Sequence, residues 1–250
     1  MYSETERARK MITNSAIYQL IEKDDFYHCS QSLYSANDWS RIGAEILLRS
    51  KLGETDLIFS QAKLVNKLFE LETKSILKVL QTYHSPENTL KDFLFINIFP
   101  STILHHEFPI FIKKMSTDFP AKRQNIVFEI VNTDYVEDIS SLKERIKLLK
   151  EFGYLIAIDD VGKGWSTLDL IIELEPHYIK LDRFFSRNLS NSKQKQQMIK
   201  SLINYAHNSD IKVVLVGIEQ EMDLSIAKYL GVDICQGFLL DKPKPISQSV

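Results

Sequence analysis

Residues 155–160 read Leu-Ile-Ala-Ile-Asp-Asp, four apolar residues followed at once by two carboxylates. A short apolar run of this kind is typical of a strand buried on both faces, as in a parallel sheet. The two acidic side chains then lie where the strand ends and a loop begins. Because the same arrangement recurs along the chain, this stretch decides the fold class.

Short apolar runs alternate with longer stretches of helical spacing. The predicted strands are 43–48, 93–98, 126–130, 155–158, 178–181, 212–216 and 234–239. The predicted helices are 61–82, 102–117, 140–152, 166–173, 194–208 and 222–230, and 4–22 has the spacing of an amphipathic helix. This alternation implies a parallel sheet with crossover helices, and about seven units in 250 residues indicate a closed barrel. We predict an α/β fold, a (β/α)8 TIM-like barrel in one domain with an N-terminal helical extension.

The composition excludes several other classes of protein. An apolar fraction of 44% is enough to bury a core, which excludes a disordered chain. The 31 Lys and Arg nearly balance the 33 Asp and Glu, so no overall field indicates nucleic-acid binding. Cys29 and Cys235 lie too far apart for a Zn site or a CxxC redox pair. The N-terminus lacks a signal-peptide core, and no stretch approaches the ~18–20 apolar residues of a membrane span. We expect a cytoplasmic protein without membrane insertion.

In a barrel of this class the active site lies at the C-terminal ends of the strands. Most of the polar side chains there offer a carboxylate or amide oxygen: Glu45, Asn97, Glu129, Asp159, Asp160, Asp182 and Gln236, with Lys180 among them. Alone, a strand-end Asp is more often a helix cap or a turn residue. Together, oxygen ligands without His or Cys suit Mg²⁺, Mn²⁺ or Ca²⁺, and adjacent aspartates can bridge two ions. Gly162 and Gly164, in the loop that follows, indicate backbone with positive φ rather than a phosphate loop.

These residues resemble the EAL domain, the family of cyclic di-GMP phosphodiesterases, from about residue 27 to residue 245. The matching motifs share the family's order along the chain: Glu45-Ile-Leu-Leu-Arg49 for ExLxR, Asn97, Glu129, 158–164 for the DDFGxG run, 179–183 for the KIDR-like run, and 236–243 for the closing QGxxxxKP-like motif. Ile46 stands where the Ala of the family name usually stands.

The resemblance implies a role for each matching residue. Glu45, Asn97, Glu129 and Asp159 would ligate a first Mg²⁺ or Mn²⁺, and Asp159 with Asp160 would support a second. Lys180 would hold the attacking water or a phosphate oxygen, and Arg49, Gln236 and Asp182 would serve substrate binding. Active relatives give the linear product pGpG, and Ca²⁺ would support binding without turnover.

The chain departs from the family pattern where a catalytic Glu is usual. The family's AEGVE-like segment reads Leu215-Val-Gly-Ile-Glu219, so Val216 stands at the first Glu, the ligand of the second metal and the base. An isopropyl group can neither ligate a cation nor accept a proton. Glu219 is the candidate substitute base, although its displacement by three residues argues against equivalent geometry.

Two further positions and one segment also differ from the family pattern. Asn132 replaces the second carboxylate of an EITE-like run, and Lys163 stands in the paired-aspartate loop where a small residue is usual. Tyr27-His28-Cys29-Ser30 takes the place of the family's first strand motif, and a lone His is more often structural than a ligand. The loop that couples substrate, second metal and dimerisation in the family is therefore altered.

Three hypotheses for function follow. The first is a degenerate EAL protein with hydrolysis lost or very weak, which binds cyclic di-GMP, perhaps with one ion, and signals to a regulatory protein partner. The second is an active phosphodiesterase that uses Glu219 or a water held by Asp160. The third is a protein-interaction regulator that no longer binds nucleotide. The expected organisation is a helical extension at 1–25, an EAL-like barrel at 26–246 and a tail at 247–250, with a homodimer as an open alternative and no nucleic-acid partner.

Overall fold

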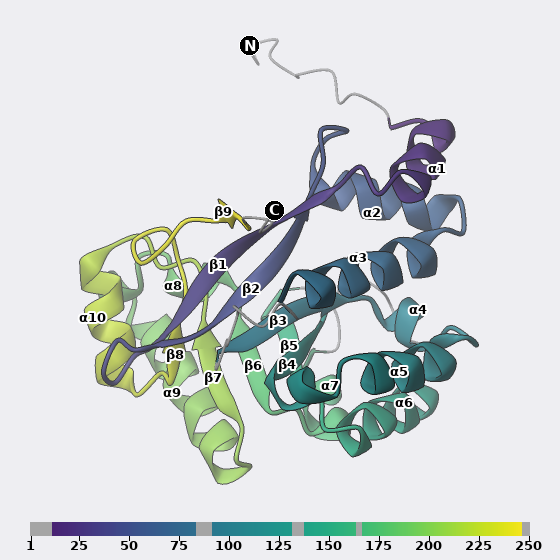
Figure 1. Cartoon of the computed structure of the whole chain (residues 1–250). Coiled ribbons are helices and arrows are strands. Elements are labelled where there is room, and N and C mark those ends of the chain that lie inside the picture. Colours follow the sequence, from purple (N-terminus) through teal and green to yellow (C-terminus); the bar gives the residue numbers. More distant parts are fainter. Residues whose placement is uncertain (1–11, 84–91, 132–137, 164–166, 247–250) are drawn as a thin grey trace.

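A computed structural model describes residues 12–83, 92–131, 138–163 and 167–246. Within these residues eight strands close a barrel, and helices surround it (Figure 1). The strand order runs from β2 through β8 to β1, and β1 pairs with β2 to complete the circle. The predicted α/β barrel is therefore confirmed.

The strands follow the predicted order along the chain. Their bounds are β1 Tyr27–Ser35, β2 Arg41–Arg49, β3 Phe93–Ile98, β4 Ile126–Ile130, β5 Leu155–Val161, β6 Tyr178–Leu181, β7 Lys212–Leu215, β8 Ile234–Cys235 and β9 Lys244–Pro245. Strands β2 to β8 pair in parallel. Strand β1 is antiparallel to both of its barrel neighbours, and β9 pairs with β1 outside the circle.

Helices cover the outside of the barrel. Their bounds are α1 Asn14–Glu22, α2 Thr55–Leu64, α3 Leu68–Tyr83, α4 Pro100–Ile103, α5 Phe108–Asp118, α6 Ile139–Glu151, α7 Thr167–Leu174, α8 Arg183–Ser186, α9 Lys193–Asn208 and α10 Glu221–Leu230. Two 3-10 turns, Pro120–Asn125 and Leu189–Asn191, complete the connections. Within the described residues no helix is both long and apolar enough to cross a membrane.

Alternate residues of each strand separate two layers of apolar side chains. Residues such as Ile96, Phe128 and Ile158 point outward and pack under the helices in the large core. Their neighbours Phe95, Val127 and Ala157 point inward and fill the lower barrel with Leu33, Tyr178, Val214 and Ile234. The barrel is thus filled by side chains below the strand ends, and the polar residues one step further along each strand lie above this plug.

Helix α1 packs on the barrel's flank against α2 and α3 (Figure 1). Thr13 caps it by accepting a hydrogen bond from Ala16 N, and Ile17, Leu20 and Ile21 are buried in a second apolar cluster. The predicted amphipathic helix therefore exists over Asn14–Glu22; Ile12 and Thr13 precede it, and residues 4–11 of the predicted range lie outside the described residues.

Three predicted boundaries were wrong. The single helix predicted at 61–82 is two helices, because α2 ends before Asn66, whose φ of 54° no helix accommodates. The helix predicted at 102–117 is likewise split into α4 and α5. The strand predicted at 234–239 ends at Cys235. Beyond it, Gly237 lies so close to the Ile218 backbone that a Cβ at this residue would be 2.0 Å from the Ile218 oxygen, which requires a glycine there.

Candidate functional site

The polar side chains at the strand ends form one layer above the apolar plug. Phe95 and Val127 point into the barrel, so two residues later Asn97 and Glu129 do the same by strand alternation. Tyr178, Val214 and Ile234 also point into the barrel. The residues two positions later, Lys180, Val216 and Gln236, therefore point inward as well. The strand register thus brings together residues that the sequence could only assign to separate strand ends.

A bulge in β5 brings both aspartates to this layer. The β5–β6 register shifts between Ile158 and Val161, and Asp160 has a φ of 52°. Consecutive side chains of a regular strand point to opposite faces, whereas this bulge lets Asp159 and Asp160 both line the same hollow. The predicted pairing of these two carboxylates is therefore a consequence of backbone geometry.

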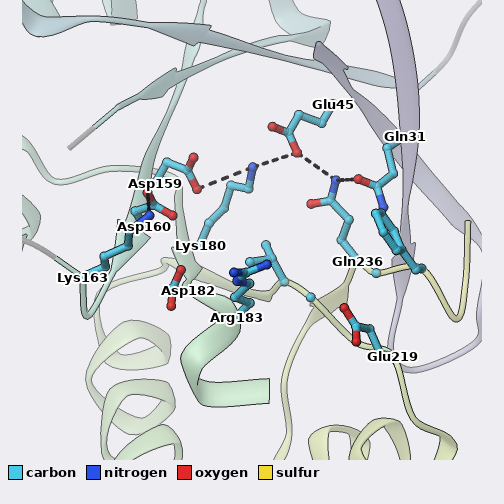
Figure 2. A pocket seen from close by; sticks show the side chains of 14 residues that line it. Gln31, Glu45, Asp159, Asp160, Lys163, Lys180, Asp182, Arg183, Glu219 and Gln236 are labelled. Carbon is cyan, nitrogen blue, oxygen red and sulfur yellow. Dashed lines mark hydrogen bonds and ion pairs between the residues drawn. The ribbon is translucent and has the colours of Figure 1, made fainter. Parts of the chain in front are cut away.

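Lys180 is the centre of the layer. Its ammonium lies 2.6 Å from Glu129 Oε1. It also lies 3.3 Å from Glu45 Oε2 and 3.6 Å from Asp159 Oδ1 (Figure 2). Its side chain is 2% exposed, and that of Glu129 is fully buried. Burial alone would lower the pKa of Lys180, but Asp159, Glu129 and Glu45 raise it well above its ordinary value. The three carboxylates therefore stabilise the charged form of this buried lysine.

A chain of amides fixes Glu45 from the other side. Gln236 Nε2 donates to Glu45 Oε2 at 2.8 Å and to Gln31 Oε1 at 3.2 Å (Figure 2). Gln31 Nε2 in turn donates to Asp241 O at 2.9 Å. Asn97 Nδ2 donates to Glu45 Oε1 at 3.3 Å. The sequence analysis missed Gln31, although it pairs directly with Glu45 across the antiparallel β1–β2 ladder.

The layer has the donors that a hard divalent cation requires. Glu129 Oε2 and Gln236 Oε1 are buried and lack a hydrogen-bond partner among the described residues. Such oxygens are costly to bury unless a ligand satisfies them. Burial raises the pKa of Glu129 well above its ordinary value, and Lys180 opposes that rise only in part. The buried carboxylates outnumber the one ammonium, so Glu45, Asn97, Glu129 and Asp159 fit an oxygen-bound Mg²⁺, Mn²⁺ or Ca²⁺.

The pKa values of the other two carboxylates, Asp159 and Glu45, shift in opposite directions. Burial raises the pKa of Asp159, and Lys180 lowers it less than burial raises it. For Glu45, burial would raise the pKa, but Lys180 and the amides of Gln236 and Asn97 lower it below its ordinary value. Glu45 is therefore the best-compensated anion of the layer.

The β7 side of the hollow offers no acid in the corresponding place. Val216 lines the hollow at the end of β7. The chain then turns at Gly217, whose φ is 74°, and Ile218 is buried. Glu219 is exposed in the wall of the same hollow and lies apart from the carboxylates around Lys180 (Figure 2). Val216 thus leaves this position of the layer without a polar group.

The other predicted residues lie in different places. Asp182 lines the hollow, and its carboxylate caps α8 by accepting a hydrogen bond from Phe184 N at 2.7 Å. Arg49 donates to Leu48 O and to Thr55 Oγ1 and is not among the described residues that line the hollow.

In the loop after the paired aspartates, the Lys163 ammonium lies 3.4 Å from Asp160 Oδ2. Gly162 has a φ of 97°, as expected. Asn132 and Gly164 lie outside the described residues.

The hollow has a volume of about 350 Å³, and its lining includes one cationic and one aromatic side chain that lie in the matched motifs but to which the sequence analysis gave no role. Arg183, the first residue of α8, and Phe238 both line it, and the Phe238 side chain is 55% exposed. His28 is elsewhere: its Nε2 lies 2.8 Å from Ser75 Oγ, as expected for a structural histidine. The site combines a buried anionic floor with a rim of cations and one aromatic ring.

Comparison with known proteins agrees with this geometry. The model of the family described as EAL domain matches residues 14–243. The cyclic di-GMP phosphodiesterase PdeF of Escherichia coli is 24% identical over 98% of this chain and 34% of its own length. The cyclic di-GMP phosphodiesterase PdeA of Borreliella burgdorferi is 31% identical over 76% of this chain and 28% of its own length. The chain thus spans about a third of the length of these relatives.

The fold has close solved counterparts. Klebsiella pneumoniae BlrP1, solved as a calcium and cyclic di-GMP complex, superposes with a TM-score of 0.80 at 22% identity, over 88% of this chain and 56% of that one. The same protein has also been solved with manganese and cyclic di-GMP. At this identity the likeness supports the barrel fold.

Proposed function

Because the chain belongs to the EAL domain family, we propose that it binds cyclic di-GMP together with one divalent cation and hydrolyses it weakly or not at all. It would act as a signalling regulator built on a phosphodiesterase scaffold. The observation that carries this proposal is the contrast within the polar layer, where the ligands around Lys180 are present and β7 offers Val216. The regulatory protein partner and the homodimer stay predictions.

The anionic floor supports metal binding. When bound there, a Mg²⁺ or Mn²⁺ ion would lower the pKa of a water ligand and neutralise charge on a phosphate. Glu45, Asn97, Glu129 and Asp159 would hold it, and Lys180 would orient Glu129 and a ligand oxygen. BlrP1 has been solved with cyclic di-GMP and either calcium or manganese, which supports the same choice of ligand and ions here.

The rim suits a dinucleotide. Arg183 offers a guanidinium for phosphate or for the edge of a base, since its planar donors match such groups. Phe238 offers an exposed ring in the same wall, and purine bases stack on aromatic side chains. These groups favour nucleotide binding over a surface that only contacts protein.

Weak hydrolysis follows from the β7 side. A general base within hydrogen-bond reach of the attacking water typically contributes 10²- to 10⁴-fold in rate. Val216 has no atom that accepts a proton, so that contribution is absent at this position. A second candidate function, an active phosphodiesterase that gives pGpG, is supported by one observation, namely that Glu219 lines the same hollow.

Calorimetric titration of cyclic di-GMP tests the proposal. We expect binding in Ca²⁺, Mg²⁺ and Mn²⁺, and intact nucleotide when the same samples are chromatographed. Appearance of pGpG at a rate typical of enzymes would favour the second candidate. A dissociation constant above about 100 μM in all three ions would overturn both candidate functions. That limit corresponds to only about 5.5 kcal/mol of binding free energy.

A further inference from the structure

The adjacent carboxylates of Asp159 and Asp160 face two different ammonium groups. Asp159 Oδ1 lies 3.6 Å from Lys180 Nζ, and Asp160 Oδ2 lies 3.4 Å from Lys163 Nζ. Figure 2 shows Lys180 and Lys163 on opposite sides of the aspartate pair. The β5 bulge thus divides the acidic group into a buried part around Lys180 and a part at the rim around Lys163.

The formal charges of the two parts differ. Around Lys180 three carboxylates meet one ammonium, which leaves a formal charge of −2 that one divalent cation would balance. Asp160 and Lys163 together are neutral. The negative charge of Asp160 is therefore already compensated by Lys163. A second divalent cation beside Asp160 would also be repelled by the Lys163 ammonium.

The β7 side removes the remaining ligand for a second ion. Val216 lines the hollow at the end of β7, and its side chain supplies no oxygen. Hard cations take six or more oxygen ligands, and the affinity for the cation decreases when fewer of these ligands are charged. The end of β7 therefore supplies neither charge nor a ligand for a second ion beside Asp160, and Asp182, which also lines the hollow, is engaged as the cap of α8.

We propose that this chain takes one divalent cation and that the Lys163 ammonium supplies the second positive charge of the site, where it can bind a phosphodiester oxygen of the ligand. The assignment of that ligand rests on the proposed function. The Lys163 side chain is 66% exposed, and lysine is a point charge on a flexible stem. An ion pair this exposed is weak, so moving from Asp160 to a phosphate costs little.

Counting bound ions tests the first half without any nucleotide. Titration with Mn²⁺, followed by calorimetry and by the electron spin resonance of free Mn²⁺, should give one ion per wild-type chain. Val216→Glu alone should still give one, whereas Val216→Glu with Lys163→Met should give two. Two ions in the wild-type chain, or two in Val216→Glu alone, would overturn the assignment.

Nucleotide affinity in saturating Ca²⁺ tests the second half, because Ca²⁺ is expected to allow binding without turnover. Lys163→Met should weaken cyclic di-GMP binding about 10-fold and reduce its dependence on salt, as expected when a phosphate contact is lost. Lys143→Met is the matched control: it changes the charge equally, and Lys143 pairs with Glu173 at 3.0 Å on the outer helices. The control should bind like the wild type, and both variants should keep its melting temperature.

The outcomes separate this inference from the proposed function. Equal nucleotide affinity of Lys163→Met and the wild type would remove the role of Lys163 and leave the proposed function standing. If the wild type binds no cyclic di-GMP, the proposed function fails together with the phosphodiester contact, and the ion count alone decides whether Lys163 replaces a second ion.

Discussion

The two sides of the hollow have the same strand geometry and opposite chemistry. On the β2–β6 side each inward position above the apolar plug is polar, and three carboxylates surround Lys180. On the β7 side the equivalent inward position is Val216, and the next acid, Glu219, lies in the exposed wall. Under the proposed function, ligand binding and hydrolysis depend on different strands of the barrel, so that one can be lost while the other is kept.

Restoring an acid on the β7 side should have the largest effect. Val216→Glu places a carboxylate in the polar layer, and we expect cyclic di-GMP turnover to rise by about 100- to 1000-fold, measured as pGpG by chromatography. Glu219→Gln serves as the control on the same wall. If Glu219 already acts as the base, Val216→Glu will change little and Glu219→Gln will abolish the basal turnover.

Breaking the β2–β6 side should have the next largest effect. Glu129→Gln keeps the shape of a fully buried side chain and removes its charge, so we expect Mn²⁺ affinity to fall by about 100-fold in calorimetry. The melting temperature of the ion-free protein should not fall, because Lys180 keeps Glu45 and Asp159 as partners. Unchanged Mn²⁺ affinity would place the ion elsewhere; Glu219→Gln should leave that affinity as it is.

Low pH should also lower the stability of the barrel through His28, which lies outside the hollow. This loss can be measured separately from the protonation of the metal ligands. Burial, with a smaller effect of Lys78, lowers the pKa of His28 from 6.5 to about 4. Between these values the unfolded chain binds a proton that the folded chain does not, so stability is full above pH 6.5 and falls as the pH drops. At pH 5 the loss is about 2 kcal/mol of unfolding free energy.

The measurement is urea unfolding at pH 7 and pH 5 in EDTA. His28→Gln should lose less stability than the wild type between these pH values, because Gln can still hydrogen-bond to Ser75 but does not titrate. Equal losses in the two proteins would show that His28 is not the group responsible.

Loosening the amide chain should have the smallest effect. Gln31→Met keeps the volume and removes the hydrogen bonds to Gln236 and Asp241, so Glu45 is held less firmly. We expect Mn²⁺ affinity to fall by about 10-fold. In a Gln236→Met background Gln31→Met should have no further effect, since Gln31 acts through Gln236. Additive losses in the double variant would contradict that order.

Much of the fold followed from the sequence because buried parallel strands are short apolar runs that need no partner to be recognised. The bounds of β3, β4 and β6 were predicted correctly for this reason. Strand β1 could be placed only through the family resemblance, since Tyr27–Ser35 mixes polar and apolar residues. The split between α2 and α3 was missed because Asn66 can end a helix or lie within one, and local sequence does not decide which.

For the site, the sequence by itself determined which side chains carry charge and oxygen, and that residue 216 carries neither. Only the tertiary structure decided that Asp159 and Asp160 face the same hollow, that Lys180 is surrounded by three carboxylates, and that Gln31 contacts Gln236. The physical reason is that a strand fixes the direction of its own side chains, whereas the distances between strands follow from register, bulges and closure of the barrel, which depend on the whole chain.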